Sequence, residues 1–81
     1  MAKKSFTRDE VFLIKLQELA ELKGDPFYEI DRYVVGQAMG QNNRSVDNIV
    51  RMLAQTNFIK KGEGNKIHLT KNGCFLISSL M

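Results

Sequence analysis

The apolar positions of the chain follow two periods, which divide it into helical segments and one region of strands. Residues 8–23 and 43–55 carry apolar side chains three and four positions apart, the spacing of a helix with one buried face. Residues 66–70 instead alternate between polar and apolar, which is typical of a half-buried strand. The pattern therefore predicts a mainly helical α+β domain.

A capping box marks the start of the first predicted helix. Thr7 is followed three residues later by Glu10, just ahead of the apolar run, so their side chains can satisfy the free N–H groups of the first turn. We expect this helix to run from Arg8 to Lys23 and to stop at Gly24. Its apolar surface is broader than one stripe, which predicts packing on two sides, by the C-terminal helix or by a second subunit. This surface consists of Val11, Phe12, Leu13, Ile14, Leu16, Leu19, Ala20 and Leu22.

The segment Gly24-Asp25-Pro26 interrupts the helical pattern, and two interpretations of the next residues remain open. Asp25 could cap a helix that has Pro26 in its first turn and continues to residue 39. Alternatively, residues 27–30 are extended and Asp31 caps a shorter helix over residues 32–39. We favour the second version because it gives the next motif a first helix of the usual length. On either interpretation the core candidates are Val35, Ala38 and Met39, with Ile30 and Val34 beside them.

The middle of the chain has the spacing of two helices joined by a tight turn. Gly36 would let the second helix approach closely, and Gly40 would supply the left-handed conformation where the first helix ends. Asn42 is a good N-cap for the second helix. Val46 and Ile49 lie one helical turn apart, so both can point back at the first helix. This arrangement resembles a helix-turn-helix.

A hairpin follows the second helix of this motif. Residues 58–61 and 66–70 are predicted to form two strands around a glycine-rich turn over residues 62–65. In the second strand Ile67 and Leu69 would face the core. A hairpin placed directly after a helix-turn-helix is typical of a winged helix, in which the hairpin is the wing.

The step from the hairpin into the last helix extends the resemblance. The segment Leu69-Thr70-Lys71-Asn72-Gly73, with Thr70 capping a mostly apolar final helix, is similar to the Leu-Thr-x-x-Gly step of small winged-helix transcriptional regulators of the MarR and PadR type. The resemblance implies a three-helix bundle with a wing over residues 58–70 and a C-terminal helix. It also implies duplex DNA as a partner, and a homodimer through the first and last helices as a further candidate. We expect residues 1–81 to form one such domain, with residues 1–6 disordered.

Positive charge collects where a winged helix would meet nucleic acid. Residues 1–40 hold six Lys and Arg against seven Asp and Glu, a balance of −1, whereas residues 41–71 hold six against two, a balance of +4. We therefore expect the recognition helix, residues 43–55, to enter the major groove and the wing to lie on adjacent backbone. Two observations oppose this, because Asp47 repels phosphate and solvated lysines are ordinary on a surface. The candidate DNA-contacting residues are Asn42, Asn43, Arg44, Ser45, Asn48, Arg51, Lys60, Lys61 and Lys66.

The sequence offers no pattern typical of an enzyme, a metal site or a cofactor site. Cys74 and His68 are the only residues of their types, so they cannot form a zinc site by themselves. A lone cysteine fits a reducing cytoplasm, and no apolar run reaches the roughly 18 residues of a transmembrane span. A second function class remains open: a winged helix that docks a protein partner through its first and last helices and binds no nucleic acid.

Overall fold

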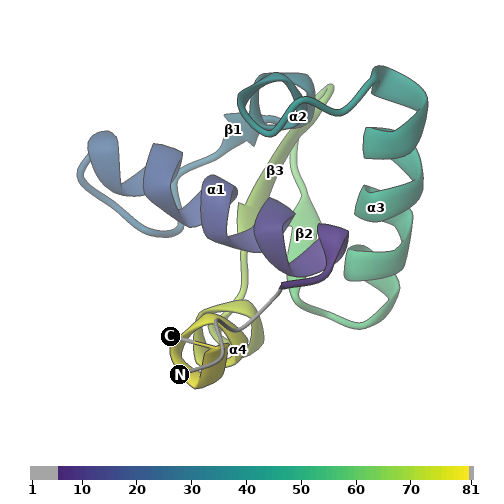
Figure 1. Ribbon diagram of the computed structural model, residues 1–81. Coiled ribbons are helices and arrows are strands. Elements are labelled where there is room, and N and C mark those ends of the chain that lie inside the picture. The colour runs from purple at the N-terminus through teal and green to yellow at the C-terminus, as the bar shows by residue number, and fades with distance from the viewer. Residues whose placement is uncertain (1–5, 81) are drawn as a thin grey trace.

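The computed structural model describes residues 6–80, and it has the element order of a winged helix (Figure 1). Residues 1–5, where the sequence predicts disorder, and Met81 lie outside the described residues, while Phe6 has no regular secondary structure. The fold class predicted from the sequence is confirmed. In chain order the elements are α1 (Arg8–Leu22), β1 (Ile30–Asp31), α2 (Arg32–Ala38), α3 (Asn43–Gln55), β2 (Ile59–Lys61), β3 (Lys66–Leu69) and α4 (Lys71–Leu80). None of these helices is long and apolar enough to cross a membrane.

The helices enclose a single core against one face of a small sheet. In Figure 1, α1 crosses in front of the strands, α2 and α4 lie on opposite sides of α1, and α3 stands beside the hairpin. The predicted core residue Val35 is buried, but Ala38 is exposed, so that prediction was wrong. The last turn of α2 has one buried side, Val35 and Gly36, and one exposed side, on which Ala38 lies. Val34, expected beside the core, is also 48% exposed, whereas Met39 packs against the core. The core consists of Phe12, Leu13, Leu16, Ala20, Ile30, Val35, Val46, Ile49, Val50, Leu53, Ile59, Ile67, Leu69 and Ile77.

The capping box at the start of α1 is present. The Thr7 N–H donates to Glu10 Oε1 at 2.8 Å, and the Glu10 N–H donates to Thr7 Oγ1 at 3.1 Å. The helix ends at Leu22, one residue earlier than predicted, and Lys23 is its C-cap. As the broad apolar surface predicts, α1 packs against more than one element: α2, α4 and the strands all contact it. One end of that surface stays uncovered, because Leu22 is 82% exposed.

The break at Gly24-Asp25-Pro26 is a loop, so the interpretation with a long helix starting at Pro26 was wrong. The Asp25 carboxylate accepts from the Phe27 N–H at 2.9 Å, which closes a tight turn instead of starting a helix. The favoured alternative is confirmed, since the Asp31 side chain caps α2 by accepting from the Tyr33 N–H at 2.8 Å. The exposed segment between Pro26 and Ile30 therefore separates two helices.

The contact between α2 and α3 depends on two glycines. At Gly36 an added Cβ would overlap Val46 Cγ2, so only glycine lets the two helices approach this closely. Gly40 has φ +75°, the left-handed conformation expected where α2 ends. Asn42 caps α3 by accepting from the Ser45 N–H at 2.9 Å. These contacts fix the direction in which α3 leaves the turn.

The sheet has three antiparallel strands in the order β1-β3-β2, where the sequence predicts only the hairpin. The additional strand is β1, in which Ile30 pairs with Ile67 and Asp31 pairs with Lys66. The predicted hairpin itself is present, and its buried residues include Ile67 and Leu69 as expected. Pairing with β1 shields one side of β3, so that β2 and β1 form the two edges of the sheet.

The start of α4 is tied to the end of α3. Thr70 caps α4 as predicted, because its Oγ1 accepts from the Gly73 N–H at 3.1 Å. The same hydroxyl donates to the Asn57 carbonyl oxygen at 2.6 Å. Asn57 has φ +65°, a left-handed conformation that asparagine tolerates, at the point where the chain leaves α3. One threonine side chain therefore joins the two helices across the hairpin.

Candidate nucleic-acid interface

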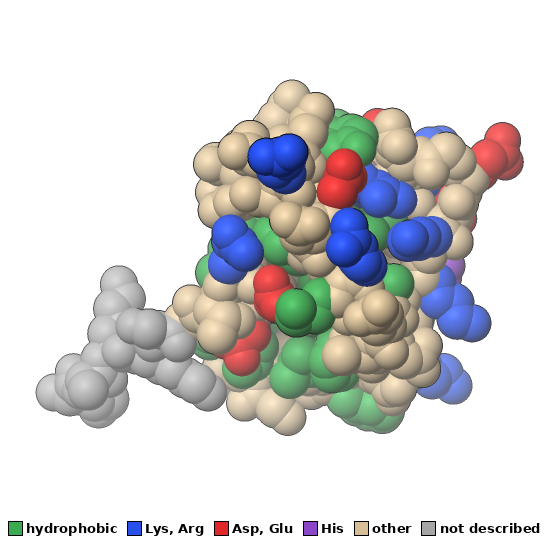
Figure 2. All heavy atoms as spheres, turned by 90° about the vertical axis from the view of Figure 1, so that its right-hand side faces the viewer, with side chains coloured by type: hydrophobic (Ala, Val, Ile, Leu, Met, Phe, Trp, Pro, Cys, Tyr) green, Lys and Arg blue, Asp and Glu red, His purple; other side chains and the backbone are tan. Residues whose placement is uncertain are grey.

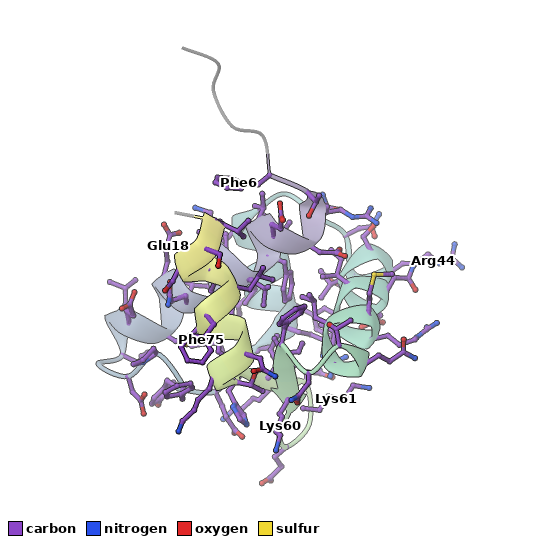
Figure 3. All side chains as sticks on the ribbon, turned by 90° about the horizontal axis from the view of Figure 1, so that it is seen from below. Phe6, Glu18, Arg44, Lys60, Lys61 and Phe75 are labelled. Carbon is purple, nitrogen blue, oxygen red and sulfur yellow. The ribbon has the colours of Figure 1, made fainter. Side chains whose placement is uncertain are left out.

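The outer face of α3 carries a row of three exposed polar side chains. Arg44, Asn48 and Arg51 are four and three residues apart, so they lie on one side of the helix. The opposite side is buried against α1, α2 and the hairpin, which leaves this row pointing away from the core. Figure 3 shows Arg44 extending outward from α3, clear of the neighbouring elements. The row presents two guanidinium groups and an amide, which can bond base edges or phosphates.

The remaining predicted residues of the helix lie at its N-terminal end and differ in what they can offer a ligand. The Asn42 side-chain oxygen already accepts the capping bond, so its NH₂ group is the part left for a partner. Asn43 is exposed, whereas Ser45 is half-buried. A contact from this end would therefore use the amides of Asn42 and Asn43 more readily than the Ser45 hydroxyl.

The β2 edge of the sheet is basic and borders α3. Arg51, Lys60 and Lys61 line one open hollow between the end of α3 and β2, together with Gln55. We call Arg51, Lys60 and Lys61 the basic edge. Figure 3 shows Lys60 and Lys61 leaving the hairpin on its solvent side, with Lys61 nearer to α3. The structure thus brings part of the predicted helix face and part of the predicted wing to one surface.

The β1 edge has the opposite character. Lys66, the third predicted lysine of the wing, lines a hollow with Glu29, Asp31 and Glu63. We call Glu29, Asp31 and Glu63 the acidic edge. Lys66 is also the register partner of Asp31 in the sheet. Lys66 therefore shares its hollow with carboxylates that come largely from another part of the chain, whereas no carboxylate lines the hollow of Lys60 and Lys61.

Asp47, which we counted against DNA binding, is engaged by two residues of α2. Its Oδ1 accepts a hydrogen bond from the Tyr33 hydroxyl at 2.8 Å, and it lies 3.7 Å from Arg32 Nη1. The hydrogen bond to Asp47, with desolvation next, raises the pKa of Tyr33 above its ordinary value. The guanidinium of Arg32 partly balances the Asp47 charge, so this carboxylate opposes an approaching phosphate less than a free one would.

Sequence reasoning left out residues that the fold adds to this surface. Lys71, treated only as the start of the last helix, lines an open hollow with Lys60, Asn57 and Asn72. Met52 is 55% exposed on α3 and offers an apolar contact next to the polar row. The net charge of residues 41–71 was a signal that could have drawn attention to Lys71. Met52 could be recognised only once the buried side of α3 was known.

Charge is distributed unevenly over the whole surface. Figure 2 looks onto α3 and the hairpin and shows Lys and Arg side chains spread across that face, with apolar groups between them and few acidic ones. The negative balance of residues 1–40 comes from acidic residues of α1, of the loop after it and of β1. A polyanion would therefore be drawn to the α3 side of the molecule.

The other chemically distinctive side chains do not assemble into a second site. Among residues 6–80, no group of three His, Cys, Asp or Glu side chains is arranged to hold a metal ion. Cys74 is half-buried, and burial, followed by the negative charge of Glu21, raises the pKa of its thiol, which disfavours the reactive thiolate. His68 Nδ1 lies 2.9 Å from the carbonyl oxygen of Leu69.

Comparisons with family models, curated proteins and solved structures found no match to this chain. The winged-helix topology therefore rests on the order and pairing of the elements themselves. The function has to be argued from the surface that this topology creates, because the fold alone occurs with many functions.

Proposed function

We propose that this protein is a DNA-binding winged helix, a small transcriptional regulator in the manner of the MarR and PadR types that its sequence resembles. The recognition helix α3 would enter the major groove, and the hairpin would contact the neighbouring backbone. The lone cysteine fits a protein that works in the reducing cytoplasm.

The observation that carries the proposal is the exposed row on α3. Arg44, Asn48 and Arg51 occupy the outward face of the second helix in a helix-turn-helix, where a groove-reading helix needs its base contacts. Arginine can make two hydrogen bonds to guanine, and asparagine can make two to adenine. The buried face of α3 is held by the core, so the row would be presented on a fixed support.

The hairpin would take part through its β2 edge rather than through its turn. Lys60 and Lys61 share a hollow with Arg51, so a phosphate strand beside α3 would meet all three cations. Lys71, which shares a second hollow with Lys60, would extend this contact. Lys66 would contribute less, because its charge is offset by the acidic edge.

An amide NMR titration of the labelled protein with mixed-sequence duplex DNA tests the proposal. At low salt we expect shift changes at residues 42–51 and 59–61 that weaken as salt is raised to the physiological level. The variant Arg51→Ala should bind several-fold more weakly while its unfolding midpoint stays unchanged. Lys23→Ala is the matched control, since it removes the same charge at the end of α1 remote from α3 (Figure 1).

Two results would overturn the proposal. One is the absence of shifts on α3 even at low salt. The other is an equal loss of binding in Arg51→Ala and Lys23→Ala, since this would reduce the interaction to net charge alone. A titration with duplex RNA of the same sequence separates DNA recognition from general attraction to polyanions, because A-form RNA closes its major groove to an α-helix.

A protein-interaction module is the second candidate, and one observation favours it. Phe75 on α4 is 70% exposed, and Leu22 at the end of α1 is 82% exposed. Figure 3 shows Phe75 on the side of α4 away from α3, so this apolar surface is separate from the basic edge. A homodimer through α1 and α4 would cover such residues. Light scattering decides this: a dimer that Phe75→Glu converts to a monomer supports the module, and a monomeric wild type opposes self-association.

A further inference from the structure

The turn of the hairpin is held against α2 by one arginine. The backbone N–H of Arg32 donates to the Asn65 carbonyl oxygen at 3.0 Å, and the Arg32 Nε donates to the same oxygen at 3.2 Å. Asn65 belongs to the turn between β2 and β3, so both bonds connect the first residue of α2 to the turn of the wing. The backbone bond continues the ladder between β1 and β3, and the side-chain bond adds a contact of α2 with the turn.

The same side chain also reaches α3. Arg32 Nη1 lies 3.7 Å from Asp47 Oδ1, and that oxygen accepts the Tyr33 hydroxyl at 2.8 Å. Asp47 lies between Arg44 and Arg51 in the chain, on the helix that carries the exposed polar row. A single guanidinium therefore touches the wing turn with one nitrogen and the recognition helix with another, which its planar fork allows.

The Arg32 side chain is placed to support other residues rather than to meet a ligand. Its side chain is only 12% exposed, whereas the exposed cations of α3 and β2 face solvent. Its Nε and Nη1 face a carbonyl oxygen and a carboxylate of the protein itself, and the low exposure of the side chain leaves little of the guanidinium for a phosphate to reach. Arg32 is therefore unsuited to be one more backbone contact.

We propose that Arg32 is a positioning residue, which locks the wing to the recognition helix so that the basic edge and the α3 row meet one nucleic-acid surface together. The inference rests on the proposed DNA-binding function. In the free protein the clamp holds the hairpin turn against α2. Because the wing is already ordered in the free protein, it loses less conformational entropy when the complex forms. A smaller entropy loss raises the affinity.

The substitution Arg32→Lys tests the clamp, because it keeps the charge but replaces the fork with a single ammonium group. The backbone bond from residue 32 to Asn65 and the β1 pairing remain available, so we expect the variant to fold. Hydrogen exchange at the residue 32 amide should quicken several-fold in the free protein, since this N–H is covered by the turn. The Gly62 amide, which bonds Lys66 within the hairpin, should exchange at its original rate.

DNA binding gives the readout that separates positioning from contact. We expect Arg32→Lys to weaken binding about three- to tenfold, the effect of one lost hydrogen bond of ordinary strength, with no change in the salt slope. Arg8→Lys, the same change at an exposed position at the start of α1, should leave both quantities unchanged. If Arg32 were instead a phosphate contact, the lysine would retain most of the affinity, and that result would overturn the inference.

Asp47→Ala is a second test, because the clamp and simple electrostatics predict different changes in DNA affinity for this variant. Simple electrostatics predicts tighter DNA binding when this carboxylate is removed, because a charge that repels phosphate is lost. The clamp predicts faster exchange at residue 32 and no tightening. Tighter binding with unchanged exchange would overturn the inference. If the wild type binds no duplex while Arg32→Lys still loosens the turn, the clamp stands and the proposed DNA-binding function has failed.

Discussion

The two edges of the sheet lie on either side of the same central strand, β3, and have opposite chemistry. The basic edge, Arg51, Lys60 and Lys61, lies where β2 borders α3. The acidic edge, Glu29, Asp31 and Glu63, lies where β1 borders the hairpin turn. The edges differ because each receives side chains from a different neighbour: α3 brings a cation to β2, and the loop before α2 brings carboxylates to β1.

This difference changes what the wing can do. A net charge of +4 over residues 41–71 suggests a hairpin that is basic throughout. The fold instead gathers cations at one edge and carboxylates at the other. If the protein binds DNA as proposed, the β2 edge is the one that would face phosphates.

The largest effect concerns stability: a substitution beneath the basic edge should lower the free energy of unfolding more than a substitution in the acidic edge does. Ile59 is 1% exposed under the basic edge, and Ile59→Ala should cost about 2–5 kcal/mol of unfolding free energy through the cavity it leaves. Asp31→Ala on the acidic edge should cost only about 0.5–2 kcal/mol, the value of a lost helix cap. Urea unfolding followed by circular dichroism measures both losses of unfolding free energy. Equal losses in the two variants would contradict the view that the core holds the basic edge more firmly than the acidic edge.

The next effect concerns DNA binding by the two groups of lysines. The double variant Lys60→Ala/Lys61→Ala should bind about tenfold more weakly at low salt, and its salt slope should fall by about 1.8, or roughly 0.9 for each lost phosphate contact. Lys66→Ala should change the slope by less than about half a unit, because three carboxylates line the same hollow as Lys66 and oppose a phosphate there. Fluorescence anisotropy at several salt concentrations gives these slopes. A slope change at Lys66 as large as that per lysine in the double variant would remove the distinction between the edges.

A smaller effect should follow from neutralising the acidic edge. Glu63→Gln removes a repulsive charge from the hairpin turn and should tighten DNA binding about twofold at low salt, since a unit charge about 10 Å from a phosphate contributes about 0.4 kcal/mol in water. The gain should disappear at physiological salt, where such distances are screened. The matched control is Glu18→Gln, at an exposed position of α1. The same gain in both variants would show that only net charge matters.

The smallest effect is expected in the pH dependence of stability. The pKa of Tyr33 is raised by its hydrogen bond to Asp47, so the folded protein holds the phenolic proton more tightly than the unfolded chain does. Its stabilising contribution is complete below the ordinary value of 10.0 and is lost as pH rises through the folded-state pKa. The free energy of unfolding, measured with urea, should therefore fall more steeply between neutral pH and pH about 11 for the wild type than for Tyr33→Phe. Tyr28→Phe, which removes an exposed phenol, should follow the wild type.

Much of the fold was predictable because its signals are local. The capping side chains of Thr7, Asp31 and Asn42 act within three residues of their own positions, so their spacing in the sequence is enough to recognise them. The left-handed residue Gly40 is equally local. The outward row of α3 follows from helical periodicity once the apolar side is identified.

The rest depended on contacts between distant segments. Strand β1 has only two residues, too few for an alternating pattern, and it exists because Ile30 finds Ile67 as a partner. Ala38 has an apolar side chain at a plausible helical spacing, but it lies on the side of α2 that no other element covers, and it stays exposed. The contact from Arg32 to Asn65 also joins segments that no local rule connects.

The sequence by itself determined the helices and the hairpin, their caps, the turn between α2 and α3 and the exposed polar face of the second helix of that motif. Each of these is set by side chains within one or two turns of backbone. Only the tertiary structure decided that Lys60 and Lys61 join Arg51 while Lys66 is placed among carboxylates. Charge acts through space, and the strand order β1-β3-β2 fixes which charges become neighbours.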